Sequence, residues 1–230
     1  TANRTIRYFD MPESNIDAKT VSSFGDEWKA FHGFDEKDLK RIGDIYFDIV
    51  TNDMLNEKTT VIDIGCGSGR FIKYLNGRFG KLVGMDPSQA IFAADELIGK
   101  NEKVELVMAS TDNIPFPDNT FDFGYSLGVL HHIPDTRKAL NDCVTKVKPG
   151  GYFLLYLYYN LDNRPFYFRI FYWLSNLIRL GVSKLSSKPK RWVCNVLAVL
   201  FYMPFVLLCR FLRWLGVSEK VRRHIPLQAY

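Results

Sequence analysis

From residue 59 onwards, short apolar segments alternate with segments of helical periodicity. Five of the apolar segments have the length and the β-branched or aromatic content of buried strands: TTVIDIG, KLVGMD, KVELVMA, FDFGYSLG and GYFLLYLY. Helical patterns lie between them, for example over 69–78 and 87–100. Strands that alternate with helices form right-handed crossovers and a parallel sheet, and strands this apolar are covered on both faces. The sequence therefore predicts an α/β fold with a doubly wound, mostly parallel sheet.

Residues 1–57 precede this predicted α/β domain, which we place at 58–160, and they are expected to be helical. One helix begins with Ser22 or Ser23 as its N-cap, and a second, amphipathic helix covers 36–56. The first helix carries an aromatic stripe at helical spacing: Phe24, Trp28 and Phe31. Such a stripe favours docking on a core, and the alternative is a cover over a ligand pocket.

The formal charge is distributed unevenly along the chain. The net charge of +5 combines −6 over residues 1–163, with 18 Lys or Arg against 24 Asp or Glu, and +11 over residues 164–230, with 12 Lys or Arg against Glu219 alone. The basic part also holds 13 of the 34 aromatic residues. We therefore assign residues 161–230 to a separate basic, aromatic-rich segment with a role of its own.

The cysteines and histidines do not predict a metal site. The four cysteines lack the spacing of metal ligands, and no histidine lies close to them in the sequence; they are Cys66, Cys143, Cys194 and Cys209. No secretory signal is recognisable, and unpaired cysteines are typical of a reducing compartment. We expect a cytoplasmic protein, with membrane association as the alternative that the basic segment leaves open.

The first predicted strand ends in a glycine-rich turn, DIGCGSG, that limits the choice of ligand. Its glycines let the backbone turn tightly and approach a ligand closely, and the helix that follows begins with free N–H groups. A dinucleotide site requires GxGxxG, with the pyrophosphate at the helix N-terminus. This turn reads GxGxG, and Asp63 lies two residues before the first glycine. A carboxylate there would repel a pyrophosphate but suits a cationic amine. Asp86, at the end of the next strand, suits ribose hydroxyls in either ligand.

Five motifs in order carry a family resemblance: VIDIGCGSGRF, LVGMDPS, IPFPDNTFD, LGVLHHIPD and VKPGGYFLLY. With these motifs, residues 59–160 resemble the class I S-adenosylmethionine-dependent methyltransferases, most closely the ubiquinone and menaquinone biosynthesis type. The resemblance implies a Rossmann-like methyltransferase fold, S-adenosyl-L-methionine as the cofactor and S-adenosyl-L-homocysteine as its product.

The resemblance also implies a set of cofactor-binding residues: Asp63, Gly65, Cys66, Gly67, Ser68, Gly69, Asp86, Pro87, Ser110, Thr111, Asp112 and Ser126. Asp63 and the glycine turn would hold the amino and carboxylate ends of the methionine moiety, and Ser126 would lie near that moiety. Asp86 would accept the ribose hydroxyls, and Pro87 would flank the adenine. In the family an acid just after the third strand meets the adenine amino group, but Ser110 occupies that position here, so that Asp112 or a backbone group is expected to replace it.

The chemistry of methyl transfer singles out two histidines. Holding the methyl donor and the acceptor close together and in line can lower the activation barrier by about 7–11 kcal/mol in the best cases. The remaining task for the protein is to remove a proton from the acceptor. His131 and His132 follow the fourth predicted strand and can accept a proton at neutral pH. Both are candidate catalytic residues. The alternative is that the His-His-Ile-Pro segment only orders the loop.

The acceptor class is narrowed by a motif that the chain lacks. Superfamily members that methylate amide or base nitrogens carry an Asn/Asp-Pro-Pro-aromatic run after the fourth strand, where this chain reads YSLGV. We predict methyl transfer to oxygen or carbon of a hydrophobic or lipid-linked small molecule. Two alternatives stay open: a methyltransferase-like domain that binds the cofactor and docks to a membrane or partner without turnover, and an RNA methyltransferase.

The basic segment departs from the family pattern. No convincing strand follows the fifth one, so the last two strands of the sheet are expected to be missing, through truncation or because the chain is a fragment. Trp192–Cys209 has 18 residues without a charge, which as a helix would span about 27 Å against a hydrocarbon core of about 30 Å. Asn195 and Pro204 interrupt this run, which argues against a transmembrane helix, and we expect a helical cap that packs on the catalytic domain and walls the substrate pocket. An interfacial membrane helix is the alternative, and a transmembrane helix is disfavoured.

Overall fold

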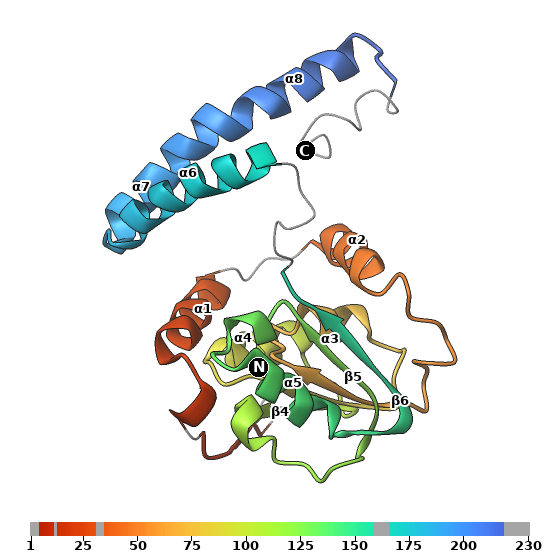
Figure 1. The fold of residues 1–230 in the computed structure, drawn as a ribbon. Coiled ribbons are helices and arrows are strands. Elements are labelled where there is room, and N and C mark those ends of the chain that lie inside the picture. The colour runs from red at the N-terminus through yellow and green to blue at the C-terminus, as the bar shows by residue number, and fades with distance from the viewer. Residues whose placement is uncertain (1–4, 12, 31–34, 159–165, 219–230) are drawn as a thin grey trace. The chain divides into compact units, whose positions relative to one another are not determined.

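A computed structural model describes residues 5–11, 13–30, 35–158 and 166–218. The chain divides into two compact units, 1–159 and 160–230. The first unit combines the N-terminal helices with the α/β fold, and the second unit holds the basic, aromatic-rich segment (Figure 1).

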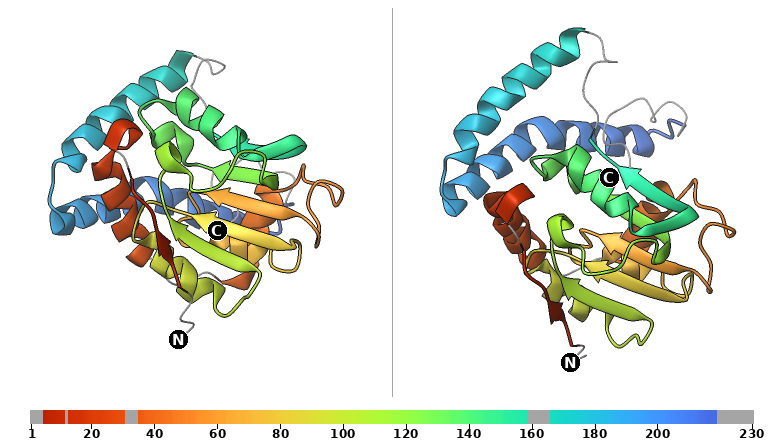
Figure 2. Two further views of the ribbon diagram at one scale, coloured as in Figure 1. Left: turned by 90° about the horizontal axis from the view of Figure 1, so that it is seen from below. Right: turned by 60° about the horizontal axis from the view of Figure 1, so that its bottom comes forward.

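A six-stranded sheet forms the centre of the first unit (Figures 1 and 2). Its strands are β1 (Arg7–Tyr8), β2 (Thr60–Ile64), β3 (Lys81–Met85), β4 (Val104–Met108), β5 (Phe121–Leu127) and β6 (Val147–Tyr156). The strand order is β1-β4-β3-β2-β5-β6, and all neighbouring strands pair in parallel. The chain runs outward from β2 to β4 and then returns to the other side of β2 as β5. The strand order therefore reverses beside β2, and such a switch point is where open α/β sheets bind ligands.

The five predicted strands are confirmed as β2 to β6, and with them the α/β fold class. β6 begins at Val147, earlier than predicted, and an irregularity in its pairing lies between Phe121 and Phe123 of β5. β1 was not predicted because two residues are too short to show a period. It joins the sheet edge by pairing with β4, and an ion pair between Arg7 and Glu105 accompanies this pairing.

Helices cover both faces of the sheet, as expected for a doubly wound fold. In the first unit they are α1 (Ala18–Ala30), α2 (Glu36–Tyr46), α3 (Arg70–Tyr74), α4 (Ala90–Ile98) and α5 (Thr136–Val144), with short 3₁₀ helices η1 (Glu13–Asn15), η2 (Thr111–Asn113) and η3 (Leu130–His132). Alternate residues of each strand enter two separate cores. Val61 packs with residues of α3 and α4, whereas Ile62 packs with residues of η3 and α5.

Two predicted helix boundaries are wrong. The first helix begins at Ala18 rather than after Ser22 or Ser23, because the Asp17 carboxylate accepts hydrogen bonds from the N–H groups of Lys19 and Thr20 and caps it there. The second predicted helix, over 36–56, ends at Tyr46. Turns follow it as far as residue 57, including a hydrogen bond from the Thr51 hydroxyl to the carboxylate of Asp53.

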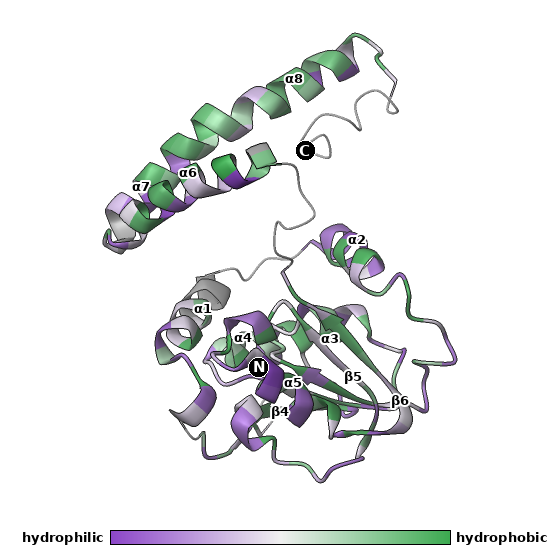
Figure 3. Ribbon diagram, in the orientation of Figure 1, coloured by the Kyte–Doolittle hydropathy of each residue, from purple (hydrophilic) through white to green (hydrophobic). Residues whose placement is uncertain are grey.

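The second unit is a pair of helical segments joined by residues 184–186. The first is α6 (Phe166–Ser183), and the second runs through α7 (Ser187–Leu197), a π-helical segment (Ala198–Tyr202) and α8 (Met203–Trp214). Figure 3 shows how apolar these helices are. No strand occurs among residues 166–218.

The apolar run of the second unit is helical across the two residues that were expected to interrupt it. The helix Pro189–Trp214 has 26 residues, including Asn195 and Pro204, and by length and composition it is able to cross a membrane. A π-helical turn comes directly before α8, in which Pro204 is the second residue. Such a turn is a common way for a helix to continue past a residue that donates no hydrogen bond.

Candidate functional site

A cavity opens at the carboxyl ends of the central strands of the first unit. It encloses about 1270 Å³ of empty space, its open mouth included. Its walls come from the ends of four neighbouring strands and the residues that follow them: 63–68 at β2, 85–88 at β3, 109–111 at β4 and 127–129 at β5. This is the edge, beside the reversal of strand order, where ligands of open α/β sheets bind.

The glycine turn that follows β2 has a backbone that other residues would not adopt. Gly65 has φ +80°, and a Cβ there would lie 2.5 Å from Cγ2 of Val129. The N–H groups of Gly65 and Cys66 both donate to the Met85 carbonyl, at 2.8 and 3.0 Å, which fixes the turn to the end of β3. Gly69 also has a positive φ, but it lies outside the cavity lining and packs against Ala94 of α4. Its role is therefore in helix packing and not in the wall of the cavity.

Asp63 is a buried carboxylate in the cavity wall, below the glycine turn. Its side chain is 2% exposed, and its Oδ2 atom has no hydrogen-bond partner among the described residues. Burial raises its pKa well above the usual value; the neighbouring Tyr125 hydroxyl acts to lower it, and the nearby charge of Asp86 adds to the rise. Unpartnered buried polar groups are rare in proteins, so a carboxylate left in this state fits a donor group on a ligand, and a cationic donor best.

Two buried hydroxyls accompany Asp63 in the lining of the cavity. Neither Ser68 Oγ nor Ser110 Oγ has a hydrogen-bond partner in the part of the chain that the structure describes. Ser68 belongs to the glycine turn, and Ser110 follows β4. Three residues with an unpartnered, buried polar atom, from two strand ends, therefore line one cavity, which indicates a polar ligand.

Asp86 lies at the end of β3, as predicted, and already accepts hydrogen bonds from the protein. Its Oδ1 atom accepts from the N–H and the hydroxyl of Ser88, at 2.8 and 2.6 Å, and its Oδ2 atom accepts from the N–H of Gly67 at 2.8 Å. Burial raises the pKa of Asp86, although these hydrogen bonds oppose the rise. Asp86 therefore holds the glycine turn in place, and ribose hydroxyls would share or replace these donors.

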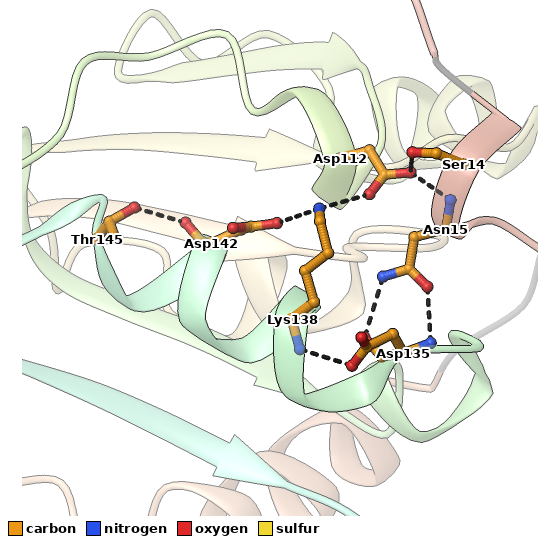
Figure 4. Close-up of polar contacts among 7 residues, drawn as sticks. All are labelled: Ser14, Asn15, Asp112, Asp135, Lys138, Asp142 and Thr145. Carbon is orange, nitrogen blue, oxygen red and sulfur yellow. Dashed lines mark hydrogen bonds and ion pairs between the residues drawn. The ribbon is translucent and has the colours of Figure 1, made fainter.

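The predicted contact between Asp112 and the adenine is not supported by the geometry. Asp112 does not line the cavity, and both of its carboxylate oxygens are occupied (Figure 4). Oδ1 pairs with the Lys138 ammonium at 3.1 Å, and Oδ2 accepts from the Ser14 hydroxyl at 3.0 Å and the Asn15 N–H at 2.6 Å. Burial acts to raise the pKa of Asp112, but Lys138, Ser14 and Asn15 together lower it below the usual value.

Asp112 is instead part of a polar cluster that anchors the N-terminal segment. We call Asn15, Asp112, Asp135 and Lys138 the N-terminal latch (Figure 4). The Asn15 amide donates to the Asp135 carbonyl at 3.0 Å and accepts from the Asp135 N–H at 2.7 Å. The Asp135 carboxylate also accepts from the N–H of Lys138, at the start of α5. Residues 14 and 15 are thus fixed to both η2 and α5.

The segment that the latch holds lines the cavity, which the sequence analysis offered only as an alternative for the aromatic stripe. The residues concerned are Asn15, Ile16, Asp17, Thr20, Val21 and Phe24. Phe24 also lies 4.9 Å, between ring centroids, from the His132 ring. For Phe24, of the predicted stripe, the geometry thus favours a cover over a pocket; Phe31 and the Trp28 side chain lie outside the described part. A single Asn within a polar segment carries no pattern that would reveal such a contact.

Ser126 lies at the end of β5 but faces away from the cavity lining. Its buried hydroxyl donates to the Ile64 carbonyl at 2.9 Å, so it joins β5 to β2. The next three residues, Leu127 to Val129, form the wall instead. A contact between the Ser126 side chain and a ligand is therefore not favoured.

The two candidate histidines have different surroundings. His132 lines the cavity, whereas His131 does not. The His131 ring lies 4.0 Å from the Tyr158 ring and 4.1 Å from the His132 ring, and neither of its nitrogens has a hydrogen-bond partner within the described ranges. Burial lowers the pKa of both histidines. Of the two, His132 is the one placed to touch a ligand.

The remaining predicted residues lie in the cavity wall. Pro87 and Thr111 contribute to the lining, and so does Cys66, whose buried thiol has a pKa well above the usual value because of its burial. Tyr46 and Arg70 also line it and were not predicted. No group of three or more His, Cys, Asp or Glu residues in the described ranges could hold a metal ion.

Comparison with known families identifies the central part of the first unit. Residues 62–155, from β2 to the end of β6, match the family model described as a methyltransferase domain. The matched segment carries the glycine turn, Asp86, Ser110 and the two histidines.

Curated relatives share this domain but differ in what they methylate. The sterol 4-C-methyltransferase of Caenorhabditis elegans is 27% identical over 172 residues, which are 71% of this chain and 51% of that protein. The demethylmenaquinone methyltransferase of Bacillus licheniformis is 33% identical over 97 residues, 40% and 41% of the two chains. The phosphoethanolamine N-methyltransferase 2 of C. elegans is 32% identical over 141 residues, which are 59% of this chain and 30% of that protein. The chain thus spans about half, or less, of the length of these relatives.

The N-terminal latch predicts that the two acidic partners of Lys138, Asp112 and Asp142, contribute differently to the stability of the protein. Asp112→Ala removes a side chain that is 2% exposed and leaves the Asn15 N–H without its acceptor, whereas Asp142→Ala removes an exposed partner one helical turn away. We expect Asp112→Ala to lower the free energy of unfolding by about 1–3 kcal/mol and to speed amide hydrogen exchange in residues 13–24. Asp142→Ala should change both by much less. Equal effects of the two substitutions would contradict this role of Asp112.

The raised pKa of Asp63 predicts how stability depends on pH. At a pH between the pKa of an unfolded aspartate and the higher pKa of folded Asp63, the folded protein holds a proton that the unfolded chain has lost. A rise in pH therefore favours the unfolded chain, and the burial of Asp63 lowers the free energy of unfolding more as the pH rises. The neutral variant Asp63→Asn should therefore be more stable than the unsubstituted, ligand-free protein at neutral pH, by a margin that shrinks toward pH 4. Urea denaturation across this range measures the margin.

Asp118→Asn is the matched control for this prediction. Asp118 is exposed, and its pKa is lowered by its hydrogen bond with Lys146, so its replacement should not stabilise the protein at any pH. A constant difference between Asp63→Asn and the unsubstituted protein across the pH range would contradict the assignment of a raised pKa to Asp63.

Proposed function

Residues 62–155 make this chain a member of the class I S-adenosylmethionine-dependent methyltransferases, and we propose that it transfers a methyl group to an oxygen or carbon atom of an apolar small molecule. The observation that carries the proposal is the carboxylate of Asp63. It is buried below the glycine turn with one oxygen unpartnered, in the wall of the cavity. S-adenosylmethionine, when bound, supplies an activated methyl group to the acceptor.

The residues of the cavity fit this cofactor better than a dinucleotide. The Asp63 carboxylate attracts the ammonium group of a methionine moiety and would repel the two negative charges of a pyrophosphate. Arg70 lines the same cavity at the start of α3 and suits the carboxylate of that moiety. Asp86 suits the ribose hydroxyls.

Ser110, and not Asp112, binds the adenine amino group in this proposal. Ser110 occupies the position where the family has an acid, it lines the cavity, and its hydroxyl is unpartnered among the described residues. That hydroxyl accepts a hydrogen bond from an adenine amino group as an acid would, although without a charge. The neighbouring Thr111 lines the same wall.

The composition of the remaining cavity wall favours an apolar acceptor. The apolar side chains of the lining include Ile16, Val21, Phe24, Phe71, Val129 and Ile133. The names of two of the relatives above specify a sterol and demethylmenaquinone as acceptors, whereas that of the third specifies phosphoethanolamine. We favour the first two because the lining offers an extended apolar surface.

His132 is the residue placed to remove a proton from the acceptor. It lines the cavity beside Phe24, and burial lowers its pKa, so its imidazole is neutral at physiological pH and can accept a proton from a hydroxyl or an acidic carbon. The His131 ring packs between His132 and Tyr158 and orients His132 without reaching the cavity.

Cofactor binding is the first test. Isothermal calorimetry should detect S-adenosylmethionine binding to the purified chain, and Asp63→Asn should weaken it at least tenfold, about 1.4 kcal/mol, because the amide cannot neutralise an ammonium group. Asp118→Asn, which alters an exposed carboxylate, should bind as the unsubstituted chain does. Absence of binding at millimolar cofactor, or tighter binding of NAD, would overturn the proposal.

Methyl transfer is the second test. Methyl-labelled S-adenosylmethionine incubated with the chain and a total cell extract should place label in the organic-soluble fraction. His132→Gln should lower the rate about 10²–10⁴-fold with unchanged cofactor affinity and should abolish the acidic limb of the pH profile. His131→Gln should reduce the rate less. Label in the RNA fraction would support the RNA alternative, and equal losses in both variants would contradict the role of His132.

A further inference from the structure

The second unit has almost no core of its own. Among the residues of 166–218 whose side chains the structure describes, only Val206 and Cys209 are buried. Its large apolar side chains are exposed instead, among them Trp173, Trp192, Leu200, Phe201, Phe211 and Trp214. Soluble proteins rarely leave apolar surface of this extent in contact with water, so these helices require an apolar environment.

The long helix of this unit is apolar on all sides over the length of a bilayer. Of its most apolar 18-residue window, 11% is buried. A helix that is apolar all round belongs in a protein core or in a membrane, and no core surrounds this one. Arg191 and Arg210 bound the uncharged run, 19 residues apart, which in a helix is about 28 Å and matches a hydrocarbon core of about 30 Å. Trp192 and Trp214 lie next to these charges, where interfacial tryptophans occur in membrane helices.

α6 has one polar side and one apolar side. Arg169, Asn176, Arg179 and Ser183 recur at intervals of three, four or seven residues and so share a face. Ile170, Leu174, Leu177 and Ile178 lie away from that face, and all of them are exposed. Arg169 and Arg179 are within about one turn of the two helix ends, from which long side chains reach the membrane surface.

The charge of the unit selects an anionic surface. Residues 166–218 contain eight Lys or Arg and no Asp or Glu. Four of these cations, Lys184, Lys188, Lys190 and Arg191, lie at or beside the connection between the two helices, and Arg210 and Arg213 lie near the far end of α8. Cations at both ends of an apolar span complement the headgroups on either side of the hydrocarbon.

We propose that the second unit is a helical hairpin that inserts into a lipid bilayer containing anionic lipids. The run from Trp192 to Cys209 lies in the hydrocarbon, and the cations at its two ends contact the headgroups. Asn176 and Asn195, the polar amides of the two helices, then find partners between helices and not in the lipid. A nucleic acid would leave the apolar surface in water, and a protein partner would not require charges at this spacing.

Vesicle flotation tests the insertion. The full chain, purified in detergent and reconstituted with phosphatidylcholine vesicles that contain phosphatidylglycerol, should float with the lipid and resist extraction by high salt and by alkaline carbonate. Phe201→Lys places a charge at an exposed position, 65% accessible, within the apolar run and should reduce the bound fraction at least tenfold. Ile49→Lys adds the same charge at an equally exposed position, 67% accessible, in the first unit and should float unchanged.

A second readout uses Cys194, the one exposed cysteine of the four. An environment-sensitive fluorophore on Cys194 should shift to shorter wavelength when vesicles are added, and the shift should be lost in Phe201→Lys. Release of the chain by high salt would mean surface attraction only and would overturn insertion. Concentration-dependent association without flotation would mean that a second copy covers the helices, and it too would overturn the proposal.

Insertion is independent of the methyl acceptor, and the same samples separate the two proposals. Calorimetry with S-adenosylmethionine on Phe201→Lys should give the affinity of the unsubstituted chain, which also shows that the first unit is folded. A chain that floats but does not bind the cofactor would leave insertion standing and remove the proposed function.

Discussion

The cavity of the first unit depends on one buried carboxyl group that has an oxygen without a hydrogen-bond partner among the described residues. Asp63 is carried into the interior by β2, a strand whose neighbours on both sides are buried, and the glycine turn above it removes the side chains that would otherwise fill the space. Burial without a partner for Oδ2 is unfavourable in the ligand-free protein. The same burial makes the site selective, because an ammonium group that enters gains a charge-assisted hydrogen bond in a medium where it is strong.

Asp86 and the N-terminal latch surround this site with fixed backbone. Asp86 ties the glycine turn to the end of β3 through Gly67 and Ser88. The latch brings residues near the N-terminus to the opposite wall, through contacts that span about a hundred residues of sequence. The two sides of the cavity are thus positioned by hydrogen bonds to carboxylates, whereas the space between them is lined mainly by apolar side chains.

The features that could be predicted from the sequence are those with a local pattern. Five apolar runs marked the strands, and the spacing of the glycines and Asp63 drew attention to the end of β2, which lines the cavity. What failed depends on contacts between distant segments. β1 is too short to show a period, and Asp112, two residues after the position of the family's acid, is held by Lys138, Ser14 and Asn15. Ser126 is similar, because its hydroxyl joins β5 to the carbonyl of Ile64 and leaves the wall to its neighbours. The end of α2 was missed because Ile49 and Val50 continue the apolar pattern through a turn in which Ile49 is exposed.

The most direct measurement is a crystal structure of the chain with S-adenosylmethionine. The amino nitrogen of the methionine moiety should lie within hydrogen-bond distance of Asp63 Oδ2, with the adenine amino group at Ser110. A ligand whose amine lies elsewhere while Asp63 remains unpartnered, or a dinucleotide phosphate seated in the glycine turn, would contradict the assignment.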